Sequence, residues 1–225
     1  MTEQATQPIR ILCWSEWSEP KEVYPKGIHG EIAGYLNTLP GMKAGAAQLD
    51  DPEQGLNERS LADSDVLVWF GHVRHDDVSE ESVRRVVARV TEGGMGFVPL
   101  HSSHMSRPLA ALLGTTGHIA GWREEEEWQR VEVRAPDHPV AAGVTDFMVP
   151  HDEMYAEPFD IPEPDALVFY SYFQGGEEFR SGCAWTRGKG RIFYFQPGHE
   201  TLPVFRQPEI RRVIVNAVKW TARRT

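Results

Sequence analysis

Short apolar runs that alternate with helical patterns constrain the fold of this chain more than any other feature. Three early runs contain few polar side chains, at residues 9–14, 65–70 and 95–100. Each is followed by a stretch of helical periodicity, and these stretches begin near Ile28, Ser79 and Arg107. Strands without polar alternation are typical of sheets that are covered on both faces. The sequence therefore predicts an α/β fold with a doubly wound, mostly parallel sheet.

The second half of the chain follows a different pattern, in which Pro and Gly rather than helices separate the apolar runs. We expect strands at 128–133, 166–173, 183–186 and 191–196, and a closing helix with an apolar face over 210–218. This added β-rich C-terminal part would extend the sheet or form an antiparallel edge. The acidic segment 149–162 is interpreted as an irregular loop. Because no flexible linker interrupts the chain, we predict a single domain over residues 1–225.

The charge of the chain narrows the classes of partner. With 23 Lys and Arg against 33 Asp and Glu, the chain has a formal net charge of −10, which disfavours nucleic acid and anionic membranes. A small molecule is the expected partner. No apolar run approaches the length of about 18 residues typical of a membrane span, and the polar N-terminus lacks the apolar stretch of a secretory signal. Cys13 and Cys183 lie in separate apolar runs, which favours buried thiols in a reducing cytoplasm.

Histidines follow three of the predicted parallel strands at the point where each strand ends. They are His72, His101 and His199. Ligands of open parallel sheets bind beyond the carboxyl ends of the strands, so we expect these imidazoles at one edge of the sheet. Glu16 and His29 follow the first strand and would reach the same edge. A lone histidine in such a place is more often a hydrogen-bonding residue, but the recurrence favours a functional cluster.

Imidazoles and carboxylates that converge are suited to divalent metal binding or to proton transfer. We predict one divalent ion, with zinc as the first candidate, bound by ligands drawn from His29, His72, His101 and His199. A metal-free pair of histidine and glutamate is the alternative, because histidine spacing in a loop specifies no coordination geometry. No nucleotide cofactor is expected.

Segment 149–162 combines carboxylates with aromatic residues, and two interpretations of it stay open. It is either a solvated surface loop or a cover that brings Glu153 and Tyr155 to the histidines. In the second case Glu153 is an acid, a base or a ligand, and Asp152 points away, because adjacent side chains of an extended segment face opposite directions. The residues expected to bind substrate are Trp14, Glu16, His104 and Tyr155. Four tryptophans lie at or near predicted strand ends: Trp14, Trp17, Trp69 and Trp122. An indole stacks well on a sugar ring, although a buried tryptophan is more often part of the core.

Long strings spread along the chain resemble the ThuA-like (trehalose-utilisation protein A) family. They include YPKGIHGEIAGYL, SDVLVWFGHVRHDDV, GGMGFVPLHSSHMS, DEMYAEPFDIPEPDALVF and RIFYFQPGHET. The resemblance implies a flavodoxin-like fold of the class I glutamine amidotransferase-like type. It also implies a cytoplasmic, sugar-catabolic protein associated with an oxidoreductase that makes 3-keto sugars, with keto-derivatives of trehalose or related disaccharides as substrates. A homo-oligomer is expected.

The wider fold family carries a nucleophilic cysteine on the turn after the strand at 95–100. The resemblance places His101 and Ser102 at this turn, so we expect no glutaminase chemistry without a thiol there. The expected reaction is proton transfer next to the carbonyl of a keto-sugar, of the isomerase, epimerase or lyase type. Its catalytic residues would be His101, Ser102, Glu153, His199 and Glu200. The alternatives are a hydrolase based on Ser102 and a non-catalytic, sugar-binding partner of an oxidoreductase.

Overall fold

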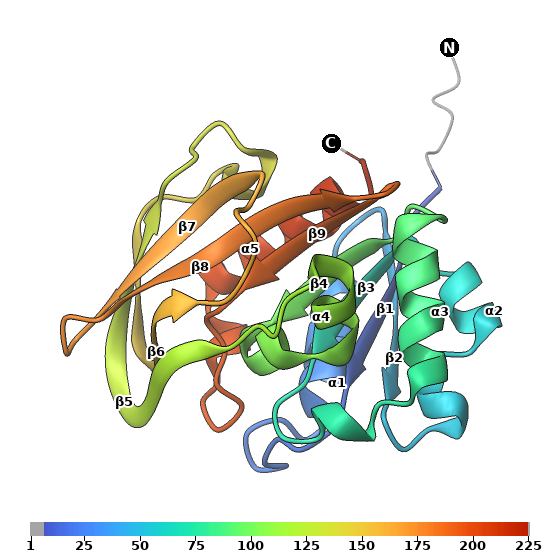
Figure 1. Ribbon diagram of the computed structural model, residues 1–225, viewed down its shortest axis with the longest axis horizontal. Helices are drawn as coiled ribbons and strands as arrows, with labels where there is room; N and C mark the ends of the chain where they lie inside the picture. Colours follow the sequence, from blue (N-terminus) through green and yellow to red (C-terminus); the bar gives the residue numbers. More distant parts are fainter. Residues whose placement is uncertain (1–6, 225) are drawn as a thin grey trace.

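One continuous mixed sheet organises the protein (Figure 1). The computed structural model describes residues 7–224, except for the side chains of residues 125 and 126. Nine strands lie in the order β2-β1-β3-β4-β9-β8-β7-β5-β6. The parallel half contains β2 (Met42–Gln48), β1 (Ile9–Ser15), β3 (Val66–Phe70), β4 (Gly96–Leu100) and β9 (Gly190–Phe195). This order is consistent with the 2-1-3-4-5 arrangement of flavodoxin-like sheets, with β9 as the fifth parallel strand.

The other half of the sheet is antiparallel and forms the left side of the molecule in Figure 1. It contains β8 (Glu178–Arg187), β7 (Ala166–Phe173), β5 (Ile119–Val133) and β6 (Phe147–Phe159). The β-rich C-terminal part therefore extends the sheet and also forms its antiparallel edge, so both expected alternatives hold. The single domain over residues 1–225 stays a prediction.

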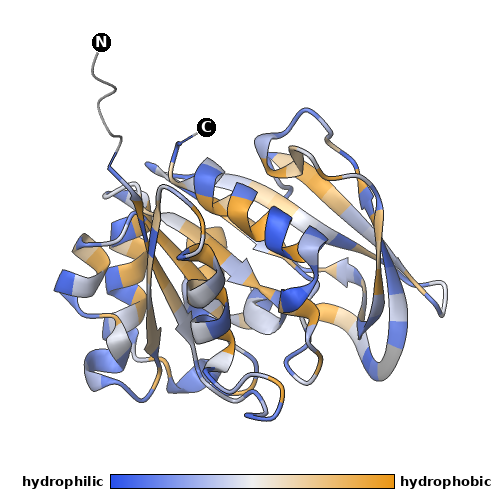
Figure 2. Cartoon of the chain, turned by 180° about the vertical axis from the view of Figure 1, so that it is seen from behind, coloured by the Kyte–Doolittle hydropathy of each residue, from blue (hydrophilic) through white to orange (hydrophobic). Residues whose placement is uncertain are grey.

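Helices cover both faces of the parallel half, which explains why its strands are apolar on both sides. One face carries α1 (Gly27–Leu36) and α5 (Pro208–Thr221), and the other carries α2 (Glu58–Ala62), α3 (Glu80–Thr91) and α4 (Arg107–Leu113). In β3, Val68 and Phe70 pack toward the first group, whereas Leu67 and Trp69 pack toward the second. Figure 2 shows hydrophobic and hydrophilic bands alternating along α5. This alternation matches a helix that is half buried.

The predicted elements of the first half are largely confirmed. The expected strands correspond to β1, β3 and β4, and the Ser79 side chain caps α3 by accepting a hydrogen bond from the N–H of Ser82 at 3.1 Å. The strand β2 was not predicted, because its sequence MKAGAAQ has few large apolar residues. It lies at the edge of the sheet, where less of a strand is buried.

Three expectations from the sequence concern a membrane span, a secretory signal and the two cysteines. No helix within residues 7–224 is long and apolar enough to cross a membrane. The polar leader that argues against a secretory signal lies mostly at residues 1–6, outside the described residues. Cys13 and Cys183 are buried and form no disulfide, and burial raises the pKa of both thiols. Neither thiol has the depressed pKa of a reactive cysteine.

The interpretation of segment 149–162 as an irregular loop is wrong. Its residues up to Phe159 belong to β6, which pairs with β5. An ion pair fastens the end of this strand to β8: Glu157 accepts from Nε and Nη2 of Arg180 at 2.8 and 3.0 Å. Burial opposes the charge on Glu157, but the Arg180 guanidinium and two backbone N–H groups lower the pKa of Glu157 below its usual value.

Replacing Glu157 by Gln is expected to lower the free energy of unfolding by about 1–3 kcal/mol at neutral pH, because charge-assisted hydrogen bonds are lost. The folded-state pKa of Glu157 is lowered. Its contribution is therefore present above the unfolded pKa of about 4.3 and is lost as the pH falls through the folded value. Urea unfolding of both proteins between about pH 6 and pH 3 measures this. A stability difference that does not shrink toward low pH would contradict the assignment.

Candidate active site

A cavity of about 460 Å³ lies beyond the carboxyl ends of β3 and β4, against β5 and β6. Its polar wall consists of His72, Ser102, His104, Glu153 and Tyr155. Its other lining residues are Val73, Met105, His118, Ile119, Trp122 and Glu124. A volume of this size is typical of a small-molecule site, and buried polar groups in an otherwise apolar wall are typical of one that orients its ligand.

His101 directly follows β4 and is the first residue of the short 3-10 helix His101–Met105. Its φ of 51° is in the left-handed region although the residue is fully buried. Such strain in a non-glycine residue recurs at functional sites, and a strained strand-to-helix turn also presents the nucleophile of α/β-hydrolases. Ser103 fastens the turn by accepting from the N–H of Gly71 at 2.9 Å and donating to the carbonyl of Trp69 at 3.2 Å. His101, rather than Ser102, therefore stands at the strained position.

The imidazole of His101 is held at both ring nitrogens. Nδ1 donates to the backbone carbonyl of Gln196 at 2.8 Å. Nε2 lies 2.8 Å from Oε2 of Glu153 and 3.3 Å from the hydroxyl of Tyr155. Burial opposes a charge on the ring, but the hydrogen bond with Glu153 and the neighbouring carboxylates raise the pKa of His101 to about 9. The same pairing outweighs burial and lowers the pKa of Glu153, so the two groups form a buried ion pair.

Glu200 connects two further histidines. Its Oε2 lies 2.8 Å from Nδ1 of His199, and its Oε1 lies 2.8 Å from Nδ1 of His72. Burial opposes the charge on Glu200, but the two imidazoles lower its pKa well below the usual range. A carboxylate accepts hydrogen bonds, so it favours a proton on Nδ1 of each ring. This leaves Nε2 of His72 and of His199 for other partners.

Three residues bring potential metal ligands together. Ligand atoms of His101, Glu153 and His199 all lie within 4.8 Å of one another, and within the described part of the chain no other group of three has this property. Histidines that bind zinc usually donate their other ring N–H to a carbonyl or a carboxylate. Gln196 and Glu200 supply these acceptors. The arrangement therefore fits a divalent ion.

Two residues that we expected to bind substrate lie elsewhere. Trp14 is buried in the core, where its ring stacks on Trp69 with centroids 3.7 Å apart. Glu16 accepts hydrogen bonds from the N–H groups of Val73 and Arg74 at 2.6 and 3.0 Å. It orders the loop that carries His72 and does not line the cavity. Neither Trp14 nor Glu16 lines the cavity, whereas His104 and Tyr155 do.

Of the four histidines that we expected as ligands, the structure brings His101 and His199 into one group. His29 lies apart from the cluster, with Nδ1 2.7 Å from Oγ of Ser15 and 3.8 Å from Oε1 of Glu19. His72 is linked to the cluster through Glu200 and is not one of the three grouped ligands. The third member of the group is Glu153, for which a ligand role was one of the expected alternatives.

Asp152 does not point away from the site. It is fully buried and accepts hydrogen bonds from the N–H groups of Glu153, Gly198 and His199 at 3.0, 3.1 and 3.0 Å. These bonds tie β6 to the loop that carries His199. Burial raises the pKa of Asp152. The expected alternation failed because the pairing of β5 with β6 shifts register on both sides of the pair Glu127–Asp152.

Some residues of the site had no clear signal in the sequence. Gln196 acts through its backbone carbonyl, which residue type does not reveal. Met105 and Ile119 line the cavity as well. Trp122 is singled out by the sequence as an indole near a strand end, but only the pairing of β5 with β6 shows that it lies beside Tyr155.

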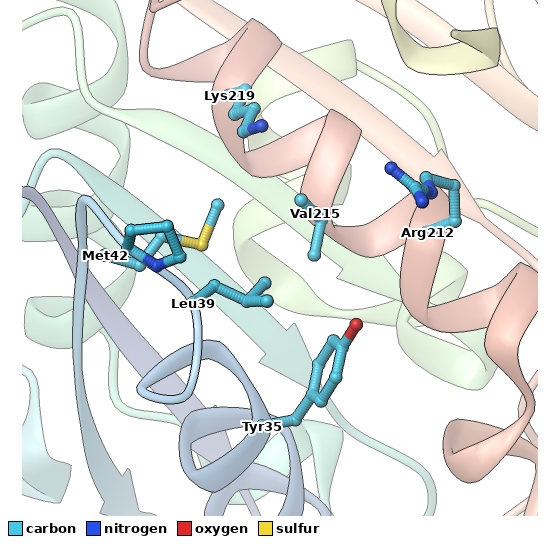
Figure 3. A pocket seen from close by; sticks show the side chains of 7 residues that line it. Tyr35, Leu39, Met42, Arg212, Val215 and Lys219 are labelled. Atoms are coloured by element: carbon cyan, nitrogen blue, oxygen red, sulfur yellow. The ribbon is translucent and has the colours of Figure 1, made fainter. Parts of the chain in front are cut away.

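A smaller cavity lies on another part of the surface, between α1 and α5 (Figure 3). Its volume is about 180 Å³, and it is lined by Tyr35, Leu39, Pro40, Met42, Arg212, Val215 and Lys219. Neither a histidine nor a carboxylate lines it. The larger cavity, which adjoins the histidine cluster, is therefore the candidate active site.

Comparisons with known proteins agree with this fold. A family model for ThuA, described as trehalose utilisation, matches residues 14–221. A structure described as ThuA-like, from Bacteroides uniformis, is 15% identical with a TM-score of 0.68, covering 98% of this chain and 94% of that one. A structure described as part of a GMP synthase, from Thermoplasma acidophilum, is 14% identical with a TM-score of 0.63, covering 97% and 96%. A glutamine amidotransferase from Thermotoga maritima is 14% identical with a TM-score of 0.56, covering 96% and 99%. The chain matches no curated protein.

Proposed function

The chain belongs to the ThuA, trehalose-utilisation family, and on that premise we propose that it moves a proton at a carbon next to the carbonyl of a keto-sugar. The proposed substrates are keto-derivatives of trehalose or of related disaccharides, supplied by a sugar oxidoreductase. Isomerisation, epimerisation and β-elimination all begin with this proton abstraction. The observation that carries the proposal is the cluster of His101, Glu153 and His199, in which Glu153 lines the same cavity as His72.

The three grouped residues are proposed to hold one divalent ion, with zinc as the first candidate. Two imidazoles and one carboxylate form a common ligand set of catalytic zinc, which leaves a position open for substrate. Such an ion, when bound, stabilises negative charge on a carbonyl oxygen by several kcal/mol. The chain's own part is to orient the ligands, because Gln196 and Glu200 fix Nδ1–H on His101 and His199.

His72 is the proposed base. It lines the cavity, and its Nδ1 is held by Glu200 at 2.8 Å, so the other ring nitrogen is available to take a proton. A carboxylate behind an imidazole fixes its tautomer and stabilises the imidazolium that forms. Glu200 thus serves as a positioning residue for both His72 and His199.

Other polar residues of the cavity are suited to hold the hydroxyl groups of a sugar. Burial lowers the pKa of His104 to about 3, and its Nδ1 donates to the carbonyl of Gly117 at 2.6 Å, so a neutral ring faces the cavity. The hydroxyls of Ser102 and Tyr155 lie 3.0 Å apart. Burial raises the pKa of Tyr155 well above its usual value, so its phenol stays a hydrogen-bond donor. Ser102 contacts this phenol rather than an imidazole, which weakens the alternative of a serine hydrolase.

Metal analysis and isotope exchange test the proposal together. Purified protein is expected to hold about one equivalent of a divalent ion and to catalyse deuterium incorporation from D2O into 3-keto-trehalose next to its carbonyl. Chelation should remove both properties, and added zinc should restore them. His199→Ala should lose both, whereas His29→Gln, which changes a histidine outside the cluster, should keep both. Less than about a tenth of an equivalent, with none taken up on addition, would overturn the metal site.

A further inference from the structure

The outer half of the cavity, at its mouth, is lined by exposed apolar side chains and differs in this from the buried polar wall. We propose that it binds the non-reacting ring of a two-ring substrate, with the indole of Trp122 as the platform on which that ring stacks. The inference rests on the proposed function for the identity of the reacting ring only.

The position of Trp122 relative to the polar wall supports this assignment. Trp122 in β5 is the register partner of Tyr155 in β6, and directly opposed residues of an antiparallel pair project from the same face of the sheet. Tyr155 is buried and contacts His101, whereas Trp122 is 62% exposed. The two aromatic side chains therefore lead from the buried cluster to the mouth of the cavity.

Two further apolar side chains reach the same mouth from other parts of the fold. Val73, in the loop after β3, is 68% exposed, and Met105, at the end of the turn after β4, is 48% exposed. Both line the cavity together with Trp122. An apolar surface contributed by three separate segments and continuous with a polar pocket is typical of a ligand-binding groove.

The chemistry of this outer half matches one ring of a sugar. A pyranose ring has a face of C–H groups that stacks on an aromatic ring, and its edge carries hydroxyl groups. His118 and Glu124 are exposed, line the same half of the cavity and can hydrogen-bond such hydroxyls. The polar wall would hold the oxidised ring at the same time. The whole cavity thus fits a disaccharide better than a single ring.

A comparison of one-ring and two-ring substrates tests the inference. Trp122→Ala is expected to lower kcat/KM for 3-keto-trehalose at least tenfold, mainly by raising KM, and to change kcat/KM for 3-keto-glucose less than threefold. Trp128→Ala is the matched control, since Trp128 lies on the same strand, is 39% exposed and does not line the cavity. It should change neither value. Equal effects of Trp122→Ala on both substrates would overturn the inference.

Binding of unoxidised sugars separates this inference from the proposed function. By calorimetry, the wild type is expected to bind trehalose more tightly than glucose, and Trp122→Ala should lose the preference. If no keto-sugar exchanges deuterium but this preference persists, the proposed reaction fails and the outer subsite stands. A wild type with no preference for trehalose would overturn the subsite. Light scattering offers a second outcome that would overturn the subsite. If the wild type is a dimer that Trp122→Ala dissociates, and the sugar preference does not change, the mouth of the cavity is a surface for self-association.

Discussion

Replacing Glu153 by Gln is expected to remove the bound ion and to lower the rate of deuterium exchange by at least about two orders of magnitude. The carboxylate is one of the three grouped ligands and the charged partner of His101 at 2.8 Å. Glutamine keeps the size and one acceptor oxygen but carries no charge, so it is a poor ligand for a divalent ion. His101 can lose its proton in the variant, which limits the cost in stability to about 1–3 kcal/mol.

The matched control is Glu157→Gln on the same strand. It makes the same chemical change, but its side chain pairs with Arg180 and does not line the cavity. It should keep the ion and the exchange rate while losing stability. Asp152 is unsuitable as a control, because its carboxylate holds three backbone N–H groups of the site. A Glu153→Gln protein with normal ion content and normal exchange would show that the buried pair is only structural.

The edge of the sheet that carries the site could be predicted from the sequence. His72, His101 and His199 follow apolar runs that the sequence predicts to be buried strands, and the carboxyl ends of parallel strands meet at one edge. Which of these histidines share an ion could not be predicted. That depends on the direction of each side chain after the strand ends, and at His101 this direction follows from a left-handed φ of 51°.

Residues inside the strands were harder to assign from the sequence than residues that follow the strands. Trp14 and Trp69 are register partners in β1 and β3, so their rings stack on one face of the sheet. A side chain inside a covered strand belongs to the core even when it lies one residue before the carboxyl end. Our expectation that Trp14 binds substrate gave the stacking ability of an indole more weight than this distinction, whereas the exposed Trp122 lies at the cavity mouth.

The sequence predicts a loop where strand β6 lies, because this segment contains prolines and several charged residues. Pro150 and Pro158 lie within it. Asp152, Glu153 and Tyr155 are all buried, although in a regular strand only every second side chain lies on the same face. Proline is tolerated in an edge strand, and register shifts interrupt the alternation of faces. Neither feature can be inferred without the partner strand β5.

His72→Ala is expected to lower the exchange rate by about two to four orders of magnitude while leaving about one equivalent of ion bound. His72 lines the cavity but is not among the grouped ligands, and it contacts the cluster through Glu200 and through an edge-on contact with the ring of His199. Removing it deletes the proposed base and leaves His101, Glu153 and His199 in place. The contrast with His199→Ala, which should lose ion and exchange together, separates the two roles.

Added imidazole gives this prediction a second measurement. A small base that enters the space left by the His72 ring should restore part of the exchange rate of His72→Ala, and it should restore none in Glu153→Gln, which lacks the ion. Loss of the ion from His72→Ala would instead return His72 to the ligand set that the sequence first suggested. Normal exchange in His72→Ala would place the base elsewhere in the cavity, where Ser102, His104 and Tyr155 are the remaining polar side chains beside Glu153 on the polar wall. Burial lowers the pKa of His104 to about 3 and raises the pKa of Tyr155, so both side chains are poor bases near neutral pH. The experiment therefore tests directly whether His72 is the base.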